Sequence, residues 1–493
     1  MKPFKAPGPD GLHAGFFQSY WSIVSDTVFR EVKEIFDNLS MPPHLNETLI
    51  TLIPKCPGAD SLGLFRPISL CNTVYKVVTK TIVKRLRPLL PHLISPLQTA
   101  FVPGRLGVDN MIITQEIIHT MSLKRGKVGY MAIKIDLEKA YDRLEWHFIR
   151  DILHLYKIPY QLVKLIMSCV SSSSISVLFN GGKLDPFLPS RGIRQGDPMS
   201  PYLFILCMEM LGFLISGKCE AKLWDPVKAS RNGLAFSHLF FADDLVLFAK
   251  ADLKNCCHIR EAFDSFYELS RQKVSFHKSK VYFSPNVSQD SRAEFCEVLG
   301  FSSTPNLGKY LGFPLKHPRS TSQDFNFIIE RVQAKLQGWK ANMLSMAGRV
   351  TLSQSVISAI PSYVMQGCVL PVRFLNHIDK INRDFLWGES DSGKKMHMVS
   401  WSKITKITKP KEKVGLGIQG TKGRNLTLAA KLYWRMTRCK GAGWAEVLHK
   451  KYQCQRQTQR SRQSRVWAAV EKGKDICDIG AKWTIGSNSS LSF

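Results

Sequence analysis

The chain has 493 residues, of which 44% are hydrophobic and 10% aromatic, and this composition excludes the intrinsically disordered and fibrous classes. Its 68 lysines and arginines outnumber its 39 aspartates and glutamates, so the formal charge is +29. The excess is concentrated after residue 300, where 32 basic residues accompany 11 acidic ones. Such an imbalance favours a polyanion, such as a nucleic acid, or an anionic membrane surface as the partner.

The sequence gives little support for a membrane or secreted protein. The longest apolar stretch, Tyr202–Ser216, is interrupted by Glu209 and is shorter than the ~20 residues that a spanning helix needs. The first residues, MKPFKAPGPDG, lack the apolar core of a secretory signal. We therefore expect no membrane partner and interpret the 12 cysteines as reduced thiols. No structural zinc site is expected from the spacing of Cys439, His449, Cys454 and Cys477.

Proline and glycine punctuate the first 110 residues, which predicts a loop-rich module with short helices such as Val24–Leu39. From Val128 the pattern changes, because VGYMAIKIDL alternates like a strand. Apolar residues then recur at helical spacing from Glu138 to Tyr156. The sequence thus predicts a strand that leads directly into a helix, with Asp136 at their junction.

Two further elements follow in chain order. The stretch Ile175–Asn180 (ISVLFN) predicts a strand that ends in a tight turn at Gly181-Gly182. Asp197 is then a candidate N-cap for a long, mostly buried helix with Pro198 at its first position, where a missing backbone N–H does no harm. From about residue 324 the pattern is helical.

The segment Leu234–Ala249 holds two apolar runs, which predict a hairpin with Asp243 and Asp244 at its tip. Asp136 likewise ends an apolar strand. A buried unpaired carboxylate costs at least several kcal/mol, and a bound cation would remove that cost. Carboxylates suit Mg²⁺, and two such ions about 3.5–4 Å apart can clamp the attacking and leaving oxygens of a phosphoryl transfer. The alternative is that the two aspartates simply form a turn.

Six strings follow one another along the chain: FRPISLCNTVYKVVTK (Phe65–Lys80), QTAFVPGR (Gln98–Arg105), IDLEKAYDRLEW (Ile135–Trp146), GIRQGDPMSPYLF (Gly192–Phe204), FADDL (Phe241–Leu245) and YLGFPL (Tyr310–Leu315). Together they resemble the reverse transcriptase domain of non-LTR (LINE-type) retrotransposons, specifically the plant kind. The match runs from KAPGPDG at Lys5 to about Gly415 and continues more weakly to the end. Six strings in the order of the family argue against an accidental similarity.

The resemblance implies an α+β, right-hand polymerase fold with a mainly antiparallel palm sheet. The expected segments are fingers at 1–127, palm at 128–283, a palm end with a primer-grip-like hairpin at 284–323, a helical thumb at 324–400 and a basic, aromatic extension at 401–493. Neither the endonuclease nor the zinc-binding or RNase H segments of complete family members are visible. The chain therefore resembles a domain truncated at both ends, and we expect an endonuclease to come from a missing segment or another protein.

In such a palm, Asp136 and Asp243 would be the metal-binding carboxylates, with Asp244 beside them as the third acid. They would hold two Mg²⁺ ions, with Mn²⁺ as the alternative metal. Tyr141 would lie under the incoming sugar and exclude a 2′ hydroxyl, unless it is simply a core tyrosine. Lys278 would protonate the departing pyrophosphate, with a plain surface lysine as the alternative.

The same resemblance implies a nucleotide-binding role for three more residues. Arg66 would contact the triphosphate, because a planar guanidinium suits phosphate oxygens. Gln195 and Gly196 would lie against the template base and the incoming nucleotide, since glycine allows close backbone approach. The alternatives are a surface ion pair for Arg66 and an ordinary helix start for the Gln195-Gly196 loop.

The later part of the chain would contact the primer and template. The YLGFPL turn resembles a primer grip, with the residues Tyr310, Leu311 and Gly312. Basic residues on the predicted thumb would border the duplex, or else form a solvated face; they are Arg331, Lys335, Lys340 and Arg349. Between Trp401 and Trp467 basic residues alternate with aromatic ones, as single-strand binding requires, although such aromatics also suit a core.

The function implied by the resemblance is RNA-directed DNA polymerisation, in which dNTPs are added to a primer 3′ end by two-metal phosphoryl transfer. The expected partners are an RNA template, a DNA primer and dNTPs. The expected location is the nucleus, with a cytoplasmic ribonucleoprotein phase. Two alternatives remain at this point: a catalytically silent retroelement relic, and a maturase-like protein that only binds RNA.

Overall fold

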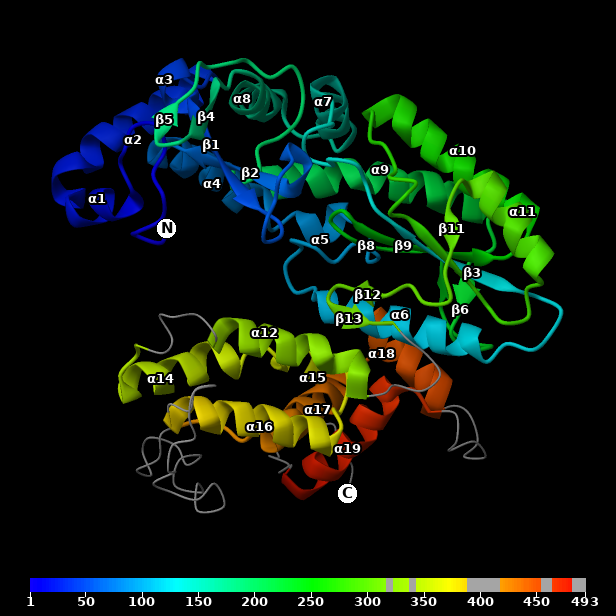
Figure 1. The fold of residues 1–493 in the computed structure, drawn as a ribbon. Helices are drawn as coiled ribbons and strands as arrows, with labels where there is room; N and C mark the ends of the chain where they lie inside the picture. Colours follow the sequence, from blue (N-terminus) through cyan, green and yellow to red (C-terminus); the bar gives the residue numbers. More distant parts are fainter. Residues whose placement is uncertain (316–321, 337–342, 388–416, 454–462, 481–493) are drawn as a thin grey trace, which may run out of the picture. The chain divides into compact units, whose positions relative to one another are not determined.

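The structure is a computed structural model that describes residues 1–315, 322–336, 343–387, 417–453 and 463–480. The chain forms two compact units, whose segments can be located in Figure 1 from the colour bar of residue numbers. Unit 1 comprises Met1–Gly107, Gly126–Val227 and Phe236–Thr304, and unit 2 comprises Val108–Arg125, Lys228–Ala235 and Pro305–Phe493. Each unit is therefore built from segments that lie far apart in the sequence.

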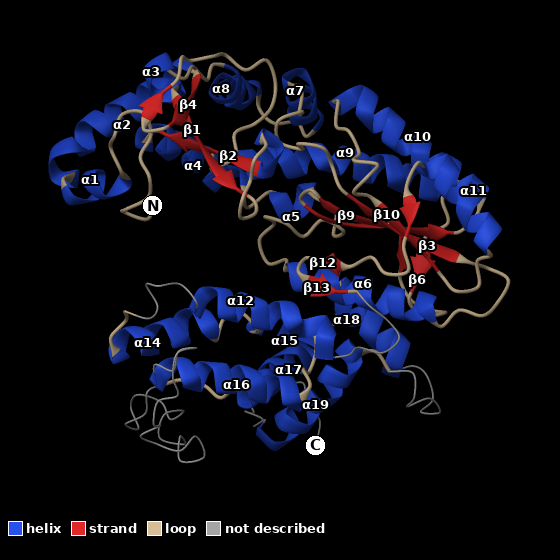
Figure 2. Cartoon of the chain, viewed as in Figure 1, coloured by secondary structure: helices blue, strands red, loops and turns tan. Residues whose placement is uncertain are grey.

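The centre of unit 1 is a five-stranded sheet in the order β11-β10-β3-β9-β8 (Figure 2). It is mainly antiparallel, as predicted, because only β10 and β11 run parallel. The central strands β3 and β9 are almost wholly buried, which explains their continuous apolar runs. The strands are β3 (Tyr130–Ile135), β8 (His238–Phe241), β9 (Asp244–Lys250), β10 (Lys280–Phe283) and β11 (Ser302–Ser303).

A second sheet of unit 1 has the order β2-β1-β4-β5. The predicted strand at 175–180 is confirmed as β4, and its turn into β5 lies at Asn180-Gly181, both of which have positive φ. The predicted helix at 24–39 is confirmed as part of α2. The sheet consists of β1 (Thr48–Pro54), β2 (Phe65–Cys71), β4 (Ile175–Phe179) and β5 (Gly182–Lys183), and its neighbouring elements are α1 (Ala14–Ser19), α2 (Trp21–Asn38), α3 (Pro43–Asn46), η1 (Leu62–Leu64), α4 (Thr73–Leu86) and α5 (Leu90–Leu93).

The longest helix of unit 1 is α9, at Ser200–Glu220, which is largely buried. It packs beside α7 (Trp146–Leu155) and α10 (Leu253–Ser270), and Figure 1 shows α9, α10 and α11 (Gln289–Leu299) on one side of β3 and β9. At 21 residues α9 is long and apolar enough to span a membrane. The expectation that the apolar stretch is too short to do so was therefore wrong for this helix. The helix instead supplies the apolar core beneath the sheet, together with α8 (Tyr160–Ser171).

The predicted helix from Glu138 is wrong over its first two turns, because α7 begins only at Trp146. The preceding segment forms turns, and Lys139 adopts a left-handed φ of 46°. Its backbone groups pair with other parts of the chain: Glu138 N–H donates to the Lys273 carbonyl at 2.8 Å, and Tyr141 C=O accepts from Ile193 N–H at 2.9 Å. These long-range hydrogen bonds replace the helical ones that the periodicity predicts.

The predicted cap of α9 is also wrong, because the helix starts at Ser200 and the proline of its first turn is Pro201 rather than Pro198. The carboxylate of Asp197 accepts from Met199 N–H at 2.9 Å and from the Tyr75 hydroxyl at 2.7 Å. Asp197 therefore closes a local turn and ties it to α4, which sequence spacing alone did not distinguish from a helix cap.

Unit 2 is mainly helical. Its helix α6 (Gly107–Ser122) is buried along most of its length. The short pairs of strands are β6 (Val227–Lys228) with β7 (Ala235–Phe236), where the chain enters and leaves the 228–235 segment, and β12 (Lys309–Tyr310) with β13 (Phe313–Pro314). The later helical elements are η2 (Ser322–Phe325), α12 (Asn326–Leu336), α14 (Met346–Leu352), η3 (Ser353–Ile357), α15 (Ser362–Met365), α16 (Val372–Trp387), α17 (Thr421–Arg438), α18 (Gly443–Leu448), η6 (His449–Gln453) and α19 (Arg465–Gly480).

A buried polar cluster joins α6 to the C-terminal part of unit 2. Glu116 on α6 is fully buried, and its Oε2 accepts from Lys451 Nζ at 2.8 Å and from the Tyr452 hydroxyl at 2.8 Å. Ser464 also donates to the Glu116 carboxylate, and Lys451 Nζ lies 3.2 Å from His119 Nδ1. The described part of 401–493 is therefore packed against the 108–125 segment through these contacts.

Candidate active site

Three acidic residues leave neighbouring strands of the five-stranded sheet at the same end. Asp136 directly follows β3, which pairs antiparallel with β9 up to the pair Ile135 and Leu245. Strands β8 and β9 are joined by Ala242 and Asp243, and Asp244 is the first residue of β9. One residue beyond the last β3–β9 pair, Asp136 and Asp244 therefore face each other, with Asp243 at the adjoining turn. The fold thus brings together three carboxylates from distant parts of the sequence.

The charges of these carboxylates interact. The pKa of Asp243 is raised, first by burial and then by the charge of Asp136, while Arg66 acts in the opposite direction. The pKa of Asp244 is raised by burial and by the charges of Asp243 and Asp136, while Lys134 lowers it. Both side chains of the 243–244 pair remain reachable by solvent even though protein surrounds them. A divalent cation at this position would relieve the mutual repulsion.

The turn that carries Lys278 lies against Asp136. The backbone N–H of Asp136 donates a hydrogen bond to Ser279 Oγ at 3.2 Å, and the Asp136 carbonyl accepts one from Ser275 N–H at 2.8 Å. Lys278 Nζ lies 3.9 Å from Asp136 Oδ1, and its side chain is 71% exposed. The structure therefore brings Lys278 to the acids. Sequence reasoning did not identify Ser279, whose only signal is a small polar residue beside a basic one.

The loop with Gln195 and Gly196 lies on strand β2, which also carries Arg66. Ser69 N–H donates to the Gln195 carbonyl at 2.7 Å. Gly196 has a φ of 122°, and a Cβ added there would lie 2.6 Å from the Ser69 carbonyl oxygen. Only glycine permits this approach. The exposed Arg66 side chain is near enough to oppose the rise in the pKa of Asp243. Strand β2 therefore contacts the loop at Ser69 and carries Arg66 toward the acids.

Arg194 anchors the same loop from inside, a role that the sequence did not reveal. Its buried guanidinium donates to Asn46 Oδ1 and to Thr48 Oγ1, each at 2.8 Å, and lies 3.8 Å from the Asp197 carboxylate. It also hydrogen-bonds to the Tyr75 hydroxyl and stacks over that ring at 4.4 Å. The residue before Gln195 is therefore fixed to α3, β1 and α4, and the chain has little freedom at the loop.

Tyr141 lies beside the acids. Its ring stacks on Phe204 of α9, with 4.9 Å between the centroids and 14° between the planes. Burial raises the pKa of the Tyr141 phenol, and the charge of Asp243 raises it further. The residue is thus half-buried between α9 and the acids, a position that combines a packed ring with a hydroxyl near the candidate reaction site.

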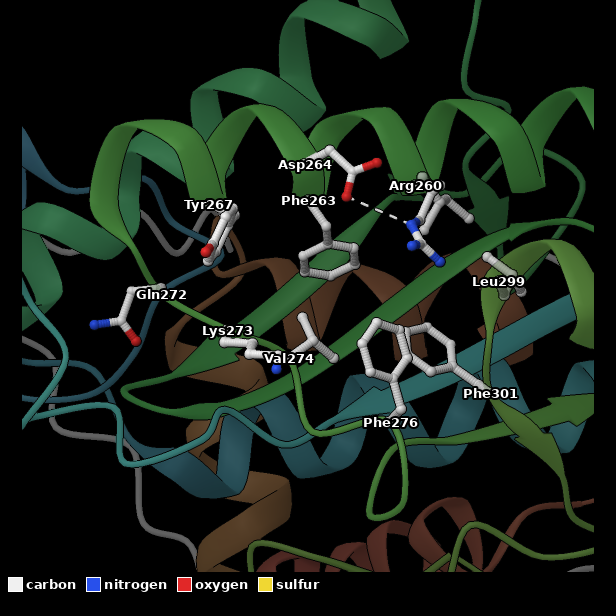
Figure 3. Close-up of a pocket in the computed structure, with 11 residues that line it drawn as sticks. Arg260, Phe263, Asp264, Tyr267, Gln272, Lys273, Val274, Phe276, Leu299 and Phe301 are labelled. Carbon is white, nitrogen blue, oxygen red and sulfur yellow. Dashed lines mark ion pairs between the residues drawn. The ribbon is translucent and has the colours of Figure 1, made fainter.

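A separate pocket of about 160 Å³ is lined by α10 and by residues that follow it in the chain (Figure 3). Its walls are largely apolar and aromatic, including Phe263 and Tyr267 of α10, and Phe276. The one acid in its lining, Asp264, is ion-paired with Arg260 at 3.4 Å. This pocket therefore lacks the paired acids that phosphoryl transfer needs, and the candidate reaction site is the open end of the sheet.

The remaining predicted site residues belong to unit 2. Tyr310 is buried at the end of β12, and Leu311 and Gly312, both with positive φ, form the tight turn into β13. Arg331 and Lys335 are exposed on α12, whereas Lys340 lies outside the described residues. Arg349 donates to the carbonyls of Leu344 and Phe385. Its guanidinium thus holds helices of unit 2 together, in addition to any role on the surface.

Most of the aromatic residues that the structure describes after position 416 are packed. Trp444 is buried with Arg435 over its ring, and Tyr452 stacks on Trp467 at 4.5 Å. Trp434 is exposed, with Arg438 over it at 4.8 Å. Trp401 lies outside the described residues. Among the aromatics of this part, Trp434 thus offers an accessible face beside a cation.

The acids suit a hard divalent cation by their chemistry. Carboxylate oxygens are what Mg²⁺ prefers, and this ion keeps several waters and takes further oxygens from substrate phosphates. Among the residues that the structure describes, no group of three or more His, Cys, Asp or Glu side chains is arranged closely enough to hold a metal ion. Asp243 and Asp244 are exposed, so solvent reaches their carboxylates.

Comparisons with known proteins agree with this geometry. A family described as reverse transcriptase (RNA-dependent DNA polymerase) matches residues 53–315, more than half of the chain. The 149 kDa protein of transposon TX1 from Xenopus laevis is 28% identical over 78% of this chain and 29% of its own length. A putative ribonuclease H protein of Arabidopsis thaliana is 35% identical over 36% of this chain and 30% of its own length.

A further relative is the Pol polyprotein of the type-2 retrotransposable element R2DM from Drosophila melanogaster. It is 30% identical over 50% of this chain and 22% of its own length. The chain thus spans less than a third of the length of these three relatives. Among solved structures, a truncated apo telomerase of Candida tropicalis aligns with a TM-score of 0.32 and 16% identity, over 50% of this chain and 55% of that one.

Proposed function

Because the chain belongs to the reverse transcriptase (RNA-dependent DNA polymerase) family, we propose that it adds deoxynucleotides to the 3′ end of a DNA primer on an RNA template. The convergence of Asp136, Asp243 and Asp244 at one end of the sheet carries this proposal. The TX1 and R2DM relatives, both named for mobile elements, support an origin in a non-LTR retrotransposon. The Arabidopsis relative supports a plant source.

The three aspartates would hold two Mg²⁺ ions, or Mn²⁺ in their place. Bound there, the metals supply charge stabilisation for the attacking primer oxygen and the departing pyrophosphate. Asp136 follows β3 and Asp243–Asp244 lie at the β8–β9 turn, so two adjoining parts of the sheet would supply the ligands. The hydrogen bonds between the Asp136 backbone and Ser275 and Ser279 fix the backbone on the Asp136 side.

The neighbouring residues of unit 1 would bind and orient the dNTP. Arg66, exposed on β2 near Asp243, would pair with triphosphate oxygens. Gln195 and Gly196 would bring backbone close to the base pair, because their loop is locked against Ser69. Lys278 is exposed and close to Asp136, so its ammonium would donate a proton to a pyrophosphate oxygen as it leaves.

Unit 2 would contribute to binding the primer and the template in a right-hand arrangement of subdomains. The buried Tyr310 and the tight Leu311-Gly312 turn support a primer-grip role. The exposed Arg331 and Lys335 on α12 support phosphate contacts, which would make binding weaken as salt rises. The large excess of basic residues after position 300 supports the same role for this unit.

The cellular setting follows from the proposed life cycle. An element that inserts DNA copies would use the enzyme in the nucleus, after a cytoplasmic ribonucleoprotein phase. Cleavage of the target would need an endonuclease from another segment or another protein. These assignments rest on the proposed mobile-element origin and on the family relationship.

Primer extension tests the proposed function directly. Purified chain, a DNA primer annealed to an RNA template, dNTPs and Mg²⁺ should give products that lengthen with time and require the dNTP complementary to the template. EDTA should stop the reaction. Salt-sensitive binding of the RNA without any extension, across a range of Mg²⁺ and Mn²⁺ concentrations, would instead assign the chain to a relic or maturase-like protein that only binds RNA.

Tyr141 should control the choice of sugar. Replacing it by Val removes the ring that stacks on Phe204, so incorporation of ribonucleotides relative to deoxynucleotides should rise about 10- to 100-fold. The matched variant Tyr141→Phe keeps the ring and should retain the discrimination. The measurement is kcat/KM for a dNTP and for the matching rNTP. Equal ratios in the Val and Phe variants would show that the ring does not select the sugar.

A further inference from the structure

Gln98 connects a distant loop to the turn that carries two of the acids. It is 1% exposed, and its Oε1 accepts from Ala100 N–H at 2.9 Å and from Ala242 N–H at 3.2 Å. The backbone beside it reinforces the contact, because Phe240 N–H donates to the Leu97 carbonyl at 2.8 Å and Thr99 N–H donates to Phe240 C=O at 3.1 Å. The 97–99 segment therefore extends alongside β8 up to the start of the turn.

Ala242 is an unusual residue for this turn. It adopts a left-handed φ of 54°, which is costly for a residue with a Cβ, and its side chain is buried. The last pair of the β8–β9 ladder is Phe241 with Asp244, so the backbone N–H of Ala242 has no partner within the ladder. The Gln98 oxygen satisfies this donor. Because Asp243 is the next residue, the same hydrogen bond fixes the direction in which the Asp243 backbone leaves the turn.

Gln98 is itself held on a rigid platform. Arg105 Nη1 donates to the Gln98 carbonyl at 2.7 Å and also to the Ser95 carbonyl, and its Nη2 donates to the Ile94 carbonyl at 2.9 Å. The backbone N–H of Ser95 in turn donates to the buried Glu209 of α9 at 2.9 Å. A continuous hydrogen-bonded path thus runs from α9 through the 94–105 segment to Ala242.

We propose that Gln98 is a positioning residue that holds the Ala242 turn, and with it Asp243 and Asp244, in the orientation needed for nucleotide addition. Its effect on the reaction rests on the proposed polymerase function, whereas its effect on the turn does not. The geometry also identifies the atom responsible. Among the described residues none accepts a hydrogen bond from Gln98 Nε2, so the side-chain oxygen alone provides the contact with the turn.

Three variants separate positioning from simple packing. Gln98→Met keeps the length of the side chain but removes the acceptor, while Gln98→Glu keeps an acceptor oxygen at the same position. Thr99→Val is the matched control, because Thr99 is buried in the same segment and its Oγ1 has no partner among the described residues. Its backbone hydrogen bond to Phe240 does not depend on the side chain.

The first measurement is hydrogen exchange followed by mass spectrometry in short peptides that cover residues 240–245, and it needs no catalytic activity. Gln98→Met should exchange at least about 10-fold faster there than wild type, because the Ala242 N–H loses its acceptor. Gln98→Glu should restore much of the protection, and Thr99→Val should match wild type. Unchanged exchange in Gln98→Met would overturn the proposal, whether or not the chain polymerises.

The second measurement is the burst of primer extension under pre-steady-state conditions. Gln98→Met should lower the burst rate constant by about 10- to 100-fold at saturating dNTP, while the burst amplitude stays at the wild-type level. A purely structural role would lower the amplitude, which reports the folded fraction, and leave the rate constant unchanged. That outcome would overturn the catalytic part of the proposal. A wild-type chain without extension would reject the proposed function, and exchange would still decide the role of Gln98.

Discussion

Replacing Asp243 by Asn is expected to slow nucleotide addition by at least about 10³-fold, because it removes a carboxylate from the set that would stabilise the reacting oxygens. The substitution preserves the size of the side chain and the backbone of the turn. Binding of the RNA–DNA duplex should therefore stay within about twofold of wild type, since it depends on basic residues elsewhere. Single-turnover extension gives the rate, and a filter or fluorescence titration gives the affinity.

Asp264→Asn is the matched control for this loss of charge. Asp264 lies on the surface of α10, where it forms an exposed ion pair with Arg260 one helical turn away. Such pairs contribute little to stability, so the control should extend primers at the wild-type rate. Comparable rates for Asp243→Asn and wild type would exclude Asp243 from the reaction. Equal losses in both variants would point to a general effect of charge.

The largest effect on stability is expected from Lys451→Met in unit 2. The variant leaves the fully buried Glu116 without its 2.8 Å ion pair, and removing one partner of such a pair costs about 3–5 kcal/mol. Denaturant unfolding of the full chain should show this loss in the transition that involves unit 2. The double variant Glu116→Gln with Lys451→Met should recover part of it, because no unpaired charge then remains buried.

Lys450 provides the control for this prediction. It is the neighbouring lysine, but its ion pair with Glu446 is partly exposed on the helix surface. Lys450→Met should therefore cost less than about 1 kcal/mol. If Lys450→Met and Lys451→Met unfold at the same denaturant concentration as wild type, the Glu116–Lys451 pair does not hold α6 to the C-terminal part.

The pH dependence of the same cluster has a definite sign. Burial and the nearby Lys451 charge lower the pKa of His119 to about 4, although Glu116 opposes the shift. In the unfolded chain His119 becomes protonated below about pH 6.5, whereas in the folded chain it stays neutral down to about pH 4. Burial tends to raise the pKa of Glu116, but Lys451 and Ser464 lower it overall, so its contribution is lost only as the pH falls below the ordinary range of a glutamate. Acidification from pH 6.5 to 4 should therefore weaken unit 2.

The acids could be predicted from the sequence because they interrupt apolar strands within strings of a recognisable order. The residues at which helices begin were harder to predict from the sequence. The segment after Asp136 has helical spacing, yet its carbonyls and amides pair with Lys273 and Ile193, far along the chain. Asp197 resembles a cap but binds Tyr75 instead. In both cases the local sequence pattern is present, but a contact with a distant part of the chain determines the structure that forms.

The residues that position the site were missed for the same reason. Gln98 acts on Ala242, which is 144 residues away, and Lys451 acts on Glu116 at a separation of 335 residues. A single sequence carries no signal for such pairs, because each member alone resembles an ordinary polar residue. Their importance follows from burial and from the hydrogen bonds that they complete, which only the folded chain displays.

Counting divalent ions in a blocked complex tests most directly whether the three aspartates form one catalytic metal site. Wild-type chain bound to an RNA template, a 3′-deoxy-terminated primer and the next dNTP should take up two Mn²⁺ ions, measured by electron paramagnetic resonance during titration. Asp136→Asn should bind the same duplex but weaken uptake of at least one ion by about tenfold or more. Identical Mn²⁺ stoichiometry and affinity in the two proteins would contradict a shared site for Asp136, Asp243 and Asp244.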